Sequence, residues 1–245
     1  MSEPATASPL HRLTTAIRSL GCADTAWFVG DRLLRRVSRG SVRLVKYYFV
    51  AQPVVASAKE SGLDGRVRIY VAEGVDEVIT QAPRPSHVLQ ERFRQRSRCV
   101  VAERNGQLAG FIWVCPEGYR EDVLRCEYRW TPVRSAAWDF DVFIDPAFRM
   151  GRLFSRLWSR THALLDSEGV RWTLSRIDAF NPASLASHRR LGARQLAQGW
   201  FLILGPVQLS VASVPPYCHL SIREASVPTL RFDLADFEHR AAKAG

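Results

Sequence analysis

The sequence lacks long apolar runs. No stretch of its 245 residues reaches the roughly 18 consecutive apolar residues that cross a bilayer. The first ten residues are small and polar, without the charged start and apolar centre of a secretory signal. Apolar residues still make up 47% of the chain, which is enough for a substantial core. We therefore expect a folded cytoplasmic protein with no transmembrane segment.

Cysteine is scarce and scattered. The five cysteines lie at positions 22, 99, 115, 126 and 218, and no two have the CxxC spacing of a zinc site. Their number is odd and their spacing irregular, which argues against a disulfide framework. We expect reduced thiols and no bound metal.

Lysine is nearly absent, with Lys46, Lys59 and Lys243 the only examples, yet the net charge is +10. Arginine carries this charge, which favours an anionic partner such as nucleic acid, acidic lipid or a phosphorylated cofactor. GC-rich coding, which favours arginine over lysine, explains the same composition. The only dense basic cluster is residues 91–98, and no nucleic-acid-binding motif is present. We do not expect a nucleic-acid partner.

Internal repeats are absent, and the pattern along the chain suggests three parts. Residues 1–60 form a basic accessory segment, with an amphipathic stretch at 11–20, a basic helix ending at Gly40 and a strand at 42–54. The basic helix is compatible with a membrane surface, an acidic protein or simple solvation. Residues 61–205 form the core, and 206–245 form a C-terminal extension that packs on it.

The core alternates short strands with helices. Asn105-Gly106 is the favoured two-residue turn of a β-hairpin. The helix at 151–169 carries its leucines and aromatics on one face, and we expect His162 on its exposed side. The pattern predicts strands at 66–73, 99–104, 107–116, 136–146, 171–180 and 199–205, and helices at 85–97, 151–169 and 182–191. This order indicates an α/β protein (α+β in some schemes) with a mixed sheet covered by helices.

Two places in the core could carry chemistry. In the first, a strand turns into the long helix between Arg149 and Arg152, with Gly151 inside the turn. A helix start binds phosphate through free N–H groups, and arginines add charge-assisted bonds. Many basic turns of this kind bind nothing, so the turn alone decides little.

The second place is the segment NPASLASHRRLGA, residues 181–193. Asn181 suits the N-cap, Pro182 the first helical position and Gly192 the residue after the end. Ser184 and His188 lie one turn apart on the helix. Residues that only start and stop a helix would explain this pattern, and a cofactor site would explain it equally well.

In this order and spacing the two places resemble the GNAT superfamily of acyl-CoA-dependent N-acyltransferases. Its members place a strand ending in V-x-P before a turn of pattern Q/R-x-x-G-x-G/A, and later carry N-x-x-A/S-x-x-x-Y/H-x-x-x-G-F/A. The matching residues here are Ile144, Asp145 and Pro146, then Arg149 to Phe154, then Asn181, Ser184, His188, Gly192 and Ala193. The chain departs from the pattern at Arg152 and Phe154, where the family prefers glycine or alanine. The resemblance covers residues 66–205 and implies a largely antiparallel central sheet.

The resemblance implies that acetyl-CoA or another acyl-CoA lies between strands 136–146 and 171–180. Backbone groups of Val142, Phe143 and Ile144 would then pair with the pantetheine arm, and one N–H would polarise the thioester carbonyl. Asn181 and Ser184 would contact the cofactor arm. The pyrophosphate would be held by the turn residues Arg149, Met150, Gly151, Arg152, Leu153 and Phe154.

For proton transfer, the resemblance places His188 where many members carry a tyrosine that protonates the departing thiolate. The base that activates the amine is expected on the strand before the turn, at Asp139 or Asp141, with Glu127 a weaker candidate. Asp139 and Asp141 are two residues apart, so we expect them on the same side of the strand. Both could instead face solvent or pair with arginines.

The implied activity is transfer of an acetyl or other acyl group to a primary amine by direct attack in a ternary complex. A small molecule or an amino sugar is the expected acceptor. One alternative replaces acyl-CoA by an acyl carrier protein that docks on the basic N-terminal segment. Another is a catalytically inactive GNAT fold used as a binding module, with Phe154 filling the cofactor slot.

Overall fold

The structure is a computed structural model, and it describes residues 21–55, 67–149, 152–223 and 225–243. The stretch at 11–20 therefore lies outside the described residues. The helices are α2 (Cys22–Val37), α3 (Ser86–Arg94), α4 (Leu153–Ser167), α5 (Pro182–Arg190) and α6 (Leu234–Lys243). The strands are β1 (Val42–Pro53), β2 (Arg68–Ala72), β3 (Arg98–Arg104), β4 (Gln107–Cys115), β5 (Tyr119–Arg120), β6 (Glu127–Thr131), β7 (Ala136–Ile144), β8 (Trp172–Asp178), β9 (Arg194–Leu204), β10 (Val207–Ala212), β11 (Cys218–Ser221) and β12 (Thr229–Asp233).

The strands confirm a mixed, largely antiparallel sheet flanked by helices. Among the described residues, the larger sheet has the order β11-β10-β9-β1-β8-β7-β4-β3-β2 and the smaller one the order β12-β6-β5. The pairs β2–β3, β3–β4, β4–β7, β9–β10 and β10–β11 are antiparallel, whereas β7–β8 is parallel. No helix in the described part of the chain is long and apolar enough to cross a membrane.

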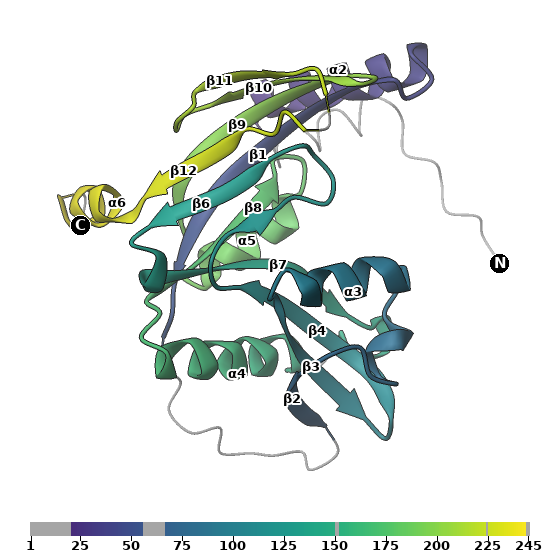
Figure 1. The fold of residues 1–245 in the computed structure, drawn as a ribbon, viewed down its shortest axis with the longest axis vertical. Coiled ribbons are helices and arrows are strands. Elements are labelled where there is room, and N and C mark those ends of the chain that lie inside the picture. The colour runs from purple at the N-terminus through teal and green to yellow at the C-terminus, as the bar shows by residue number, and fades with distance from the viewer. Residues whose placement is uncertain (1–20, 56–66, 150–151, 224, 244–245) are drawn as a thin grey trace. The chain divides into compact units, whose positions relative to one another are not determined.

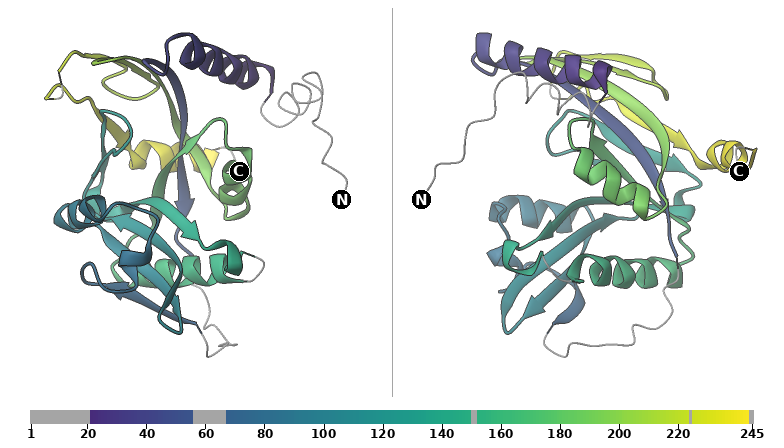
Figure 2. Two further views of the ribbon diagram at one scale, coloured as in Figure 1. Left: turned by 90° about the vertical axis from the view of Figure 1, so that its right-hand side faces the viewer. Right: turned by 180° about the vertical axis from the view of Figure 1, so that it is seen from behind.

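The chain forms two compact units, which are described separately. Unit 1 contains residues 1–50, 122–126 and 176–230, and unit 2 contains residues 51–121, 127–175 and 231–245. Each unit combines segments that are distant in the sequence, as the colours in Figures 1 and 2 show. The boundaries expected at 60/61 and 205/206 stay predictions.

In unit 2, α3 and α4 cover opposite faces of the strands β3, β4 and β7 (Figure 1). The predicted hairpin is confirmed, since Asn105 and Gly106 both have the positive φ of a type I′ turn (53° and 77°). The core is aromatic. Its rings stack closely, with centroids 4.3 Å apart for Tyr119 and Phe140 and 4.4 Å apart for Tyr128 and Trp138.

The expectation that His162 is exposed was wrong. Its side chain lies on the buried face of α4, one turn after Trp158, and is only 7% exposed. Its Nε2 lies 3.2 Å from Nε2 of Gln52, and its Nδ1 accepts a hydrogen bond from the Val55 N–H (3.4 Å). The buried face of α4 is therefore wider than the row of large apolar residues that marks it in the sequence.

In unit 1, α2 packs on β1 through two buried carboxylates. Asp24 accepts hydrogen bonds from the Lys46 ammonium (2.5 Å) and the Tyr48 hydroxyl (2.6 Å). Asp31 accepts one from the Leu44 N–H (2.8 Å). These contacts fix a helix that begins nine residues earlier than the basic stretch at 31–40 suggests.

Candidate active site

A first candidate region, in unit 2, begins where β7 and β8 stop pairing. Their parallel ladder joins Ala136 to Trp172, Ala137 to Thr173 and Trp138 to Leu174. Beyond that point β7 runs on to Ile144 and pairs with β4 on its other edge. Within the described residues, the edge of β7 that faced β8 is thus free of strand pairing from position 139 onward. Free backbone N–H and C=O groups on such an edge can receive an extended ligand.

A β-bulge interrupts β7 within this free stretch. Phe143 lies opposite Phe111 and Phe140 opposite Trp113, so Asp141 and Val142 together face the single residue Ile112. Asp141 has φ +48°, a conformation that few residues other than glycine adopt. The extra residue breaks the two-residue alternation of the strand. The expectation that Asp139 and Asp141 point to the same side was therefore wrong.

Asp141 faces α3 and is held by two arginines. It accepts hydrogen bonds from Arg84, whose Nε lies 2.8 Å away, and from Nη1 of Arg92 (2.5 Å). Arg92 is buried, and its guanidinium lies over the rings of Trp113 and Phe140. Asp141 thus forms salt bridges with arginines, one of the two alternatives that the sequence left open. Both oxygens of this carboxylate are therefore occupied by charge-assisted hydrogen bonds from guanidiniums.

Asp139 occupies a contrasting environment. Its side chain is only 2% exposed and lies beside the hydroxyls of Thr173 and Ser175 on β8. Burial raises its pKa to about 7, although the two hydroxyls act to lower it. Yet Oδ1 and both hydroxyl oxygens make no hydrogen bond of ordinary geometry within the described residues. A carboxyl with this pKa and free bonding capacity is suited to accept a proton near neutral pH.

The turn after β7 is only partly described, because Met150 and Gly151 lie outside the described residues. Its described part begins with Asp145, whose carboxylate accepts the Ala147 N–H (2.9 Å). Val142, Phe143 and Ile144 are half-buried, and the exposed Arg149 donates from Nε to the Ile144 carbonyl (3.1 Å).

The start of α4 shows where the other predicted phosphate-binding residues lie. Arg152 is exposed at the N-cap and gives no side-chain cap to the helix. Leu153 is buried in the core. Phe154 is half-buried, with its ring edge-on to Trp158 at 6.3 Å. The first turn of α4 thus offers backbone N–H groups and a nearby guanidinium, which together fit a phosphate group.

A second candidate region, described by itself, is α5 in unit 1, and its predicted cap residues are confirmed. The Oδ1 atom of Asn181 accepts the Ser184 N–H (3.0 Å), Pro182 occupies the first turn, and Gly192 has φ +82°. The side-chain oxygen of Asn181 is therefore used by the helix. Its amide NH₂ group and the second lone pair of Oδ1 are left for a ligand in this conformation.

His188 also lies on α5 and is 8% exposed. Burial lowers its pKa to about 4, so at pH 7 roughly one imidazole in a thousand carries the extra proton. Its predicted role as a proton donor thus depends on a change in its surroundings when substrate binds. The side chain lines a pocket of about 580 Å³ in unit 1, together with Asp24, Tyr48 and Leu185.

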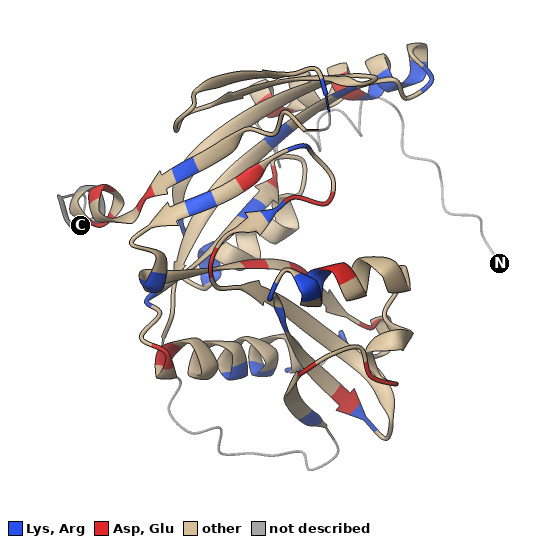
Figure 3. Ribbon diagram, viewed as in Figure 1, with Lys and Arg blue, Asp and Glu red and all other residues tan. Residues whose placement is uncertain are grey.

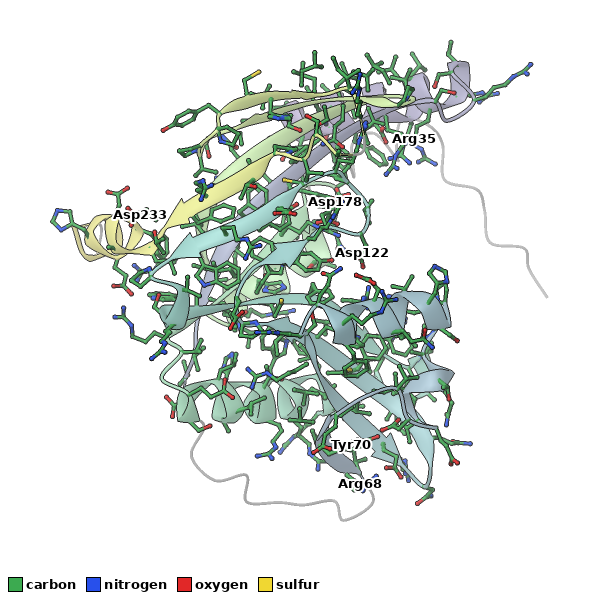
Figure 4. The ribbon with its side chains drawn as sticks, viewed as in Figure 1. Arg35, Arg68, Tyr70, Asp122, Asp178 and Asp233 are labelled. Atoms are coloured by element: carbon green, nitrogen blue, oxygen red, sulfur yellow. The ribbon has the colours of Figure 1, made fainter. Side chains whose placement is uncertain are left out.

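Sequence reasoning missed Thr173, Ser175, Arg84 and Arg92. A signal for the first two was present, because the hydroxyls alternate along a strand and so share one face. Nothing in the sequence pointed to the two arginines, because their pairing with Asp141 depends on how α3 and the residues just before it pack. Figure 4 labels another carboxyl, the half-buried Asp178 on β8 in unit 1, whose pKa is raised by burial.

The chain was compared with protein families, curated proteins and solved structures. No family model matches the chain, and no curated protein matches it. The solved structures that resemble it include GNAT-family N-acetyltransferases. A tandem GNAT protein from the clavulanic acid biosynthesis pathway has a TM-score of 0.45 and 12% identity, with 70% of this chain and 55% of that one covered.

Two further structures show the same level of similarity. A GCN5-related N-acetyltransferase from Kribbella flavida has a TM-score of 0.42 and 10% identity, covering 71% of this chain and 63% of that one. An aminoglycoside acetyltransferase from an uncultured soil metagenomic sample has a TM-score of 0.39 and 14% identity, covering 52% and 88%. The chain thus spans less than two thirds of the first two proteins. All three TM-scores are below 0.5, so these similarities do not identify the activity of this chain.

Proposed function

We propose that the protein is an N-acyltransferase that moves an acetyl or other acyl group from acyl-CoA to a primary amine of a small molecule or amino sugar. The observation that carries the proposal is Asp139. It is a buried carboxyl with a pKa of about 7, placed where the pairing of β7 with β8 ends. Acyl transfer to an amine needs a base of this strength, because the attacking nitrogen must lose a proton.

The bulge of β7 supports the same proposal. It changes the direction of the backbone between Asp141 and Phe143 on a strand edge that has no pairing with β8 in the described part of the chain. An N–H on this edge can donate to the thioester oxygen and stabilise the negative charge that develops during attack. Pantetheine amides extend the ladder along Val142 to Ile144, and the N-terminal turn of α4 with Arg149 and Arg152 receives the pyrophosphate.

In the proposed reaction the amine nitrogen attacks the thioester carbon directly. The C–N bond forms, the C–S bond breaks, and the products are an amide and a thiol. Asp139 accepts the proton lost by nitrogen, directly or through one water molecule. The leaving thiolate takes a proton from His188 or from solvent, and Asn181 binds the cofactor arm through its NH₂ group.

The first test is thermal unfolding with and without acetyl-CoA. Ligand at a hundred times its dissociation constant stabilises the native state by about 2.7 kcal/mol. We expect a clear rise in Tm that is reduced when Arg149 and Arg152 are both changed to Gln. Absence of any rise with acetyl-CoA, longer acyl-CoAs or free CoA would contradict the proposal. We would then test whether an acyl carrier protein is the donor, or whether the protein is a catalytically inactive binding module.

The second test is thiol release from acetyl-CoA with a panel of amines and amino sugars. With an active acceptor, we expect kcat to rise with pH through about 7 in the wild type. Asp139→Asn should abolish this rise and lower kcat by about 10²-fold or more while leaving the KM for acyl-CoA unchanged. Asp166→Asn, on the exposed side of α4, is the matched control and should behave as wild type. An Asp139→Asn enzyme with normal kcat would show that the base lies elsewhere.

A further inference from the structure

The polarity of β10 in unit 1 is inverted. Its buried face carries Gln208 and Ser210, and Gln208 is held there by hydrogen bonds to the Arg125 carbonyl (2.8 Å) and the Ser210 hydroxyl (3.0 Å). Its other face carries Val207, Leu209 and Val211, which are half-buried or exposed. A sheet with one face in water normally places its apolar residues inside. The outward apolar row of β10 therefore calls for a contact that the described chain does not provide.

The neighbouring strands extend this apolar row. The cross-strand partners of Val207 and Leu209 on β9 are Leu204 and Leu202, and the partner of Leu209 on β11 is Leu220. Leu220 is 53% exposed and Leu204 45%. Residues 195–222 contain no aspartate, glutamate, lysine or arginine, and β10 and β11 accordingly carry no charged residue in Figure 3.

The helix α2 lies on the same side of the sheet. The Lys46 ammonium bonds to Asp24 on α2 and also lies 5.5 Å from the ring centre of Trp200, which is paired with Val211 in the outward row. Figure 2 shows α2 beside the ends of these strands in both views. The outward residues of β9, β10 and β11 together with the exposed side of α2 are called the apolar face below.

On α2, apolar and basic side chains alternate at the surface. Val29, Leu33 and Val37 follow one another at intervals of one turn and are 45%, 65% and 80% exposed. The exposed Arg32 and Arg36 flank this row. Both carboxylates of α2, Asp24 and Asp31, are buried in its packing against β1, so the exposed side of the helix carries only positive charge.

We propose that the apolar face binds an anionic lipid surface. Apolar side chains beside arginines, with no exposed carboxylate, are the chemistry of elements that lie in a bilayer interface and are attracted to acidic headgroups. A second copy of the chain fits less well, since a symmetric contact through this face would bring arginines together without an exposed carboxylate on α2 or any carboxylate in residues 195–222 to pair with them. This proposal is independent of the proposed enzymatic function.

The test is co-sedimentation of the full chain with phosphatidylglycerol/phosphatidylcholine vesicles, compared with phosphatidylcholine vesicles alone. We expect binding only to the anionic vesicles, weakened by salt because the arginines are exposed. Changing Arg32 and Arg36 to Gln, or Leu33 and Leu220 to Gln, should weaken binding about tenfold or more. The matched control changes two exposed arginines of unit 2, Arg134 and Arg160, to Gln and should bind as wild type.

Because all altered side chains are exposed, circular dichroism and Tm should be unchanged in every variant, and this is checked first. Equal binding to both vesicle types, or equal loss in the Arg134 and Arg160 control, would overturn the proposal in favour of non-specific adsorption. A concentration-dependent dimer in sedimentation velocity that Leu33→Gln/Leu220→Gln abolishes, without vesicle binding, would also overturn it and assign the face to self-association.

Discussion

The buried carboxyl of Asp139 should make the stability of the protein fall between acid and neutral pH. Its pKa is raised from 3.8 to about 7 in the folded state because burial disfavours the charged form. The folded protein therefore holds a proton that the unfolded chain has released. The stabilisation from this proton is fully present below pH 4 and is lost as pH rises to about 7, where it levels off.

The size of this effect follows from the two pKa values. A pKa that is about three units higher in the folded state, at about 1.4 kcal/mol per unit, corresponds to about 4 kcal/mol. In a domain of this length, 1 kcal/mol changes Tm by about 2–4 °C. The total effect on Tm is therefore on the order of 10 °C.

The perturbation is Asp139→Asn, which keeps the shape of the side chain and removes its titration. Tm is measured for both proteins by circular dichroism and tryptophan fluorescence from pH 4 to 8.5. We expect the two proteins to melt together near pH 4, and Asp139→Asn to be the more stable by about 10 °C above pH 7. Asp166→Asn should follow the wild type throughout. Parallel curves for wild type and Asp139→Asn, or a difference of opposite sign, would refute the assignment of a buried, neutral Asp139.

Three further changes probe the rest of the site. His188→Gln should stabilise the protein at acid pH relative to the wild type. Burial lowers the imidazole pKa from 6.5 to about 4, so its contribution is present above pH 6.5 and is lost by about 3 kcal/mol as pH falls to 4, an effect that Tm at pH 4 and 7.5 detects. Gly110→Ala should cost about 1–3 kcal/mol in urea unfolding, because a Cβ there would lie 2.7 Å from the Phe143 carbonyl oxygen, whereas Gly74→Ala, in open space, should be neutral. Asn181→Ala should cost about 1 kcal/mol through loss of the cap, and Asn181→Ser should restore stability. If Asn181→Ser restores stability but does not restore acetyl-CoA binding in the thermal assay, the NH₂ group has a role in binding that is separate from the cap.

Local turn and cap chemistry made much of the fold predictable. The hairpin at Asn105-Gly106 and the limits of α5 depend on residues that favour particular backbone angles wherever they occur. The segment after Pro206 was not predicted, although it forms β10, β11, β12 and α6. Its strands are short, and Pro215 and Pro216 lie between β10 and β11. The apolar residues of β10 face outward, so the alternation that normally indicates a buried face is misleading here.

The candidate site was less predictable because it depends on a defect in a strand. The sequence around Asp139 and Asp141 contains no glycine to mark a bulge, and a regular strand puts the two carboxyls on one side. The extra residue opposite Ile112 is specified by the pairing of β7 with β4, which is a non-local contact. A reader of the sequence can find both carboxyls but cannot see that Asp141 bonds to Arg84 and Arg92 whereas Asp139 lies beside Thr173 and Ser175.

The bulge thereby places two carboxyls, two residues apart, in contrasting environments. Turned toward α3, Asp141 accepts hydrogen bonds from Arg84 and Arg92, and its backbone is left-handed at φ +48°. Turned the other way, Asp139 lies beside the hydroxyls of Thr173 and Ser175, and burial is the largest influence on its pKa. The pH range in which Asp139 becomes a competent base is then the range in which it costs the fold most. In a protein built for stability alone a neutral side chain would serve better at this position, and the retained cost is the physical reason to look for function there.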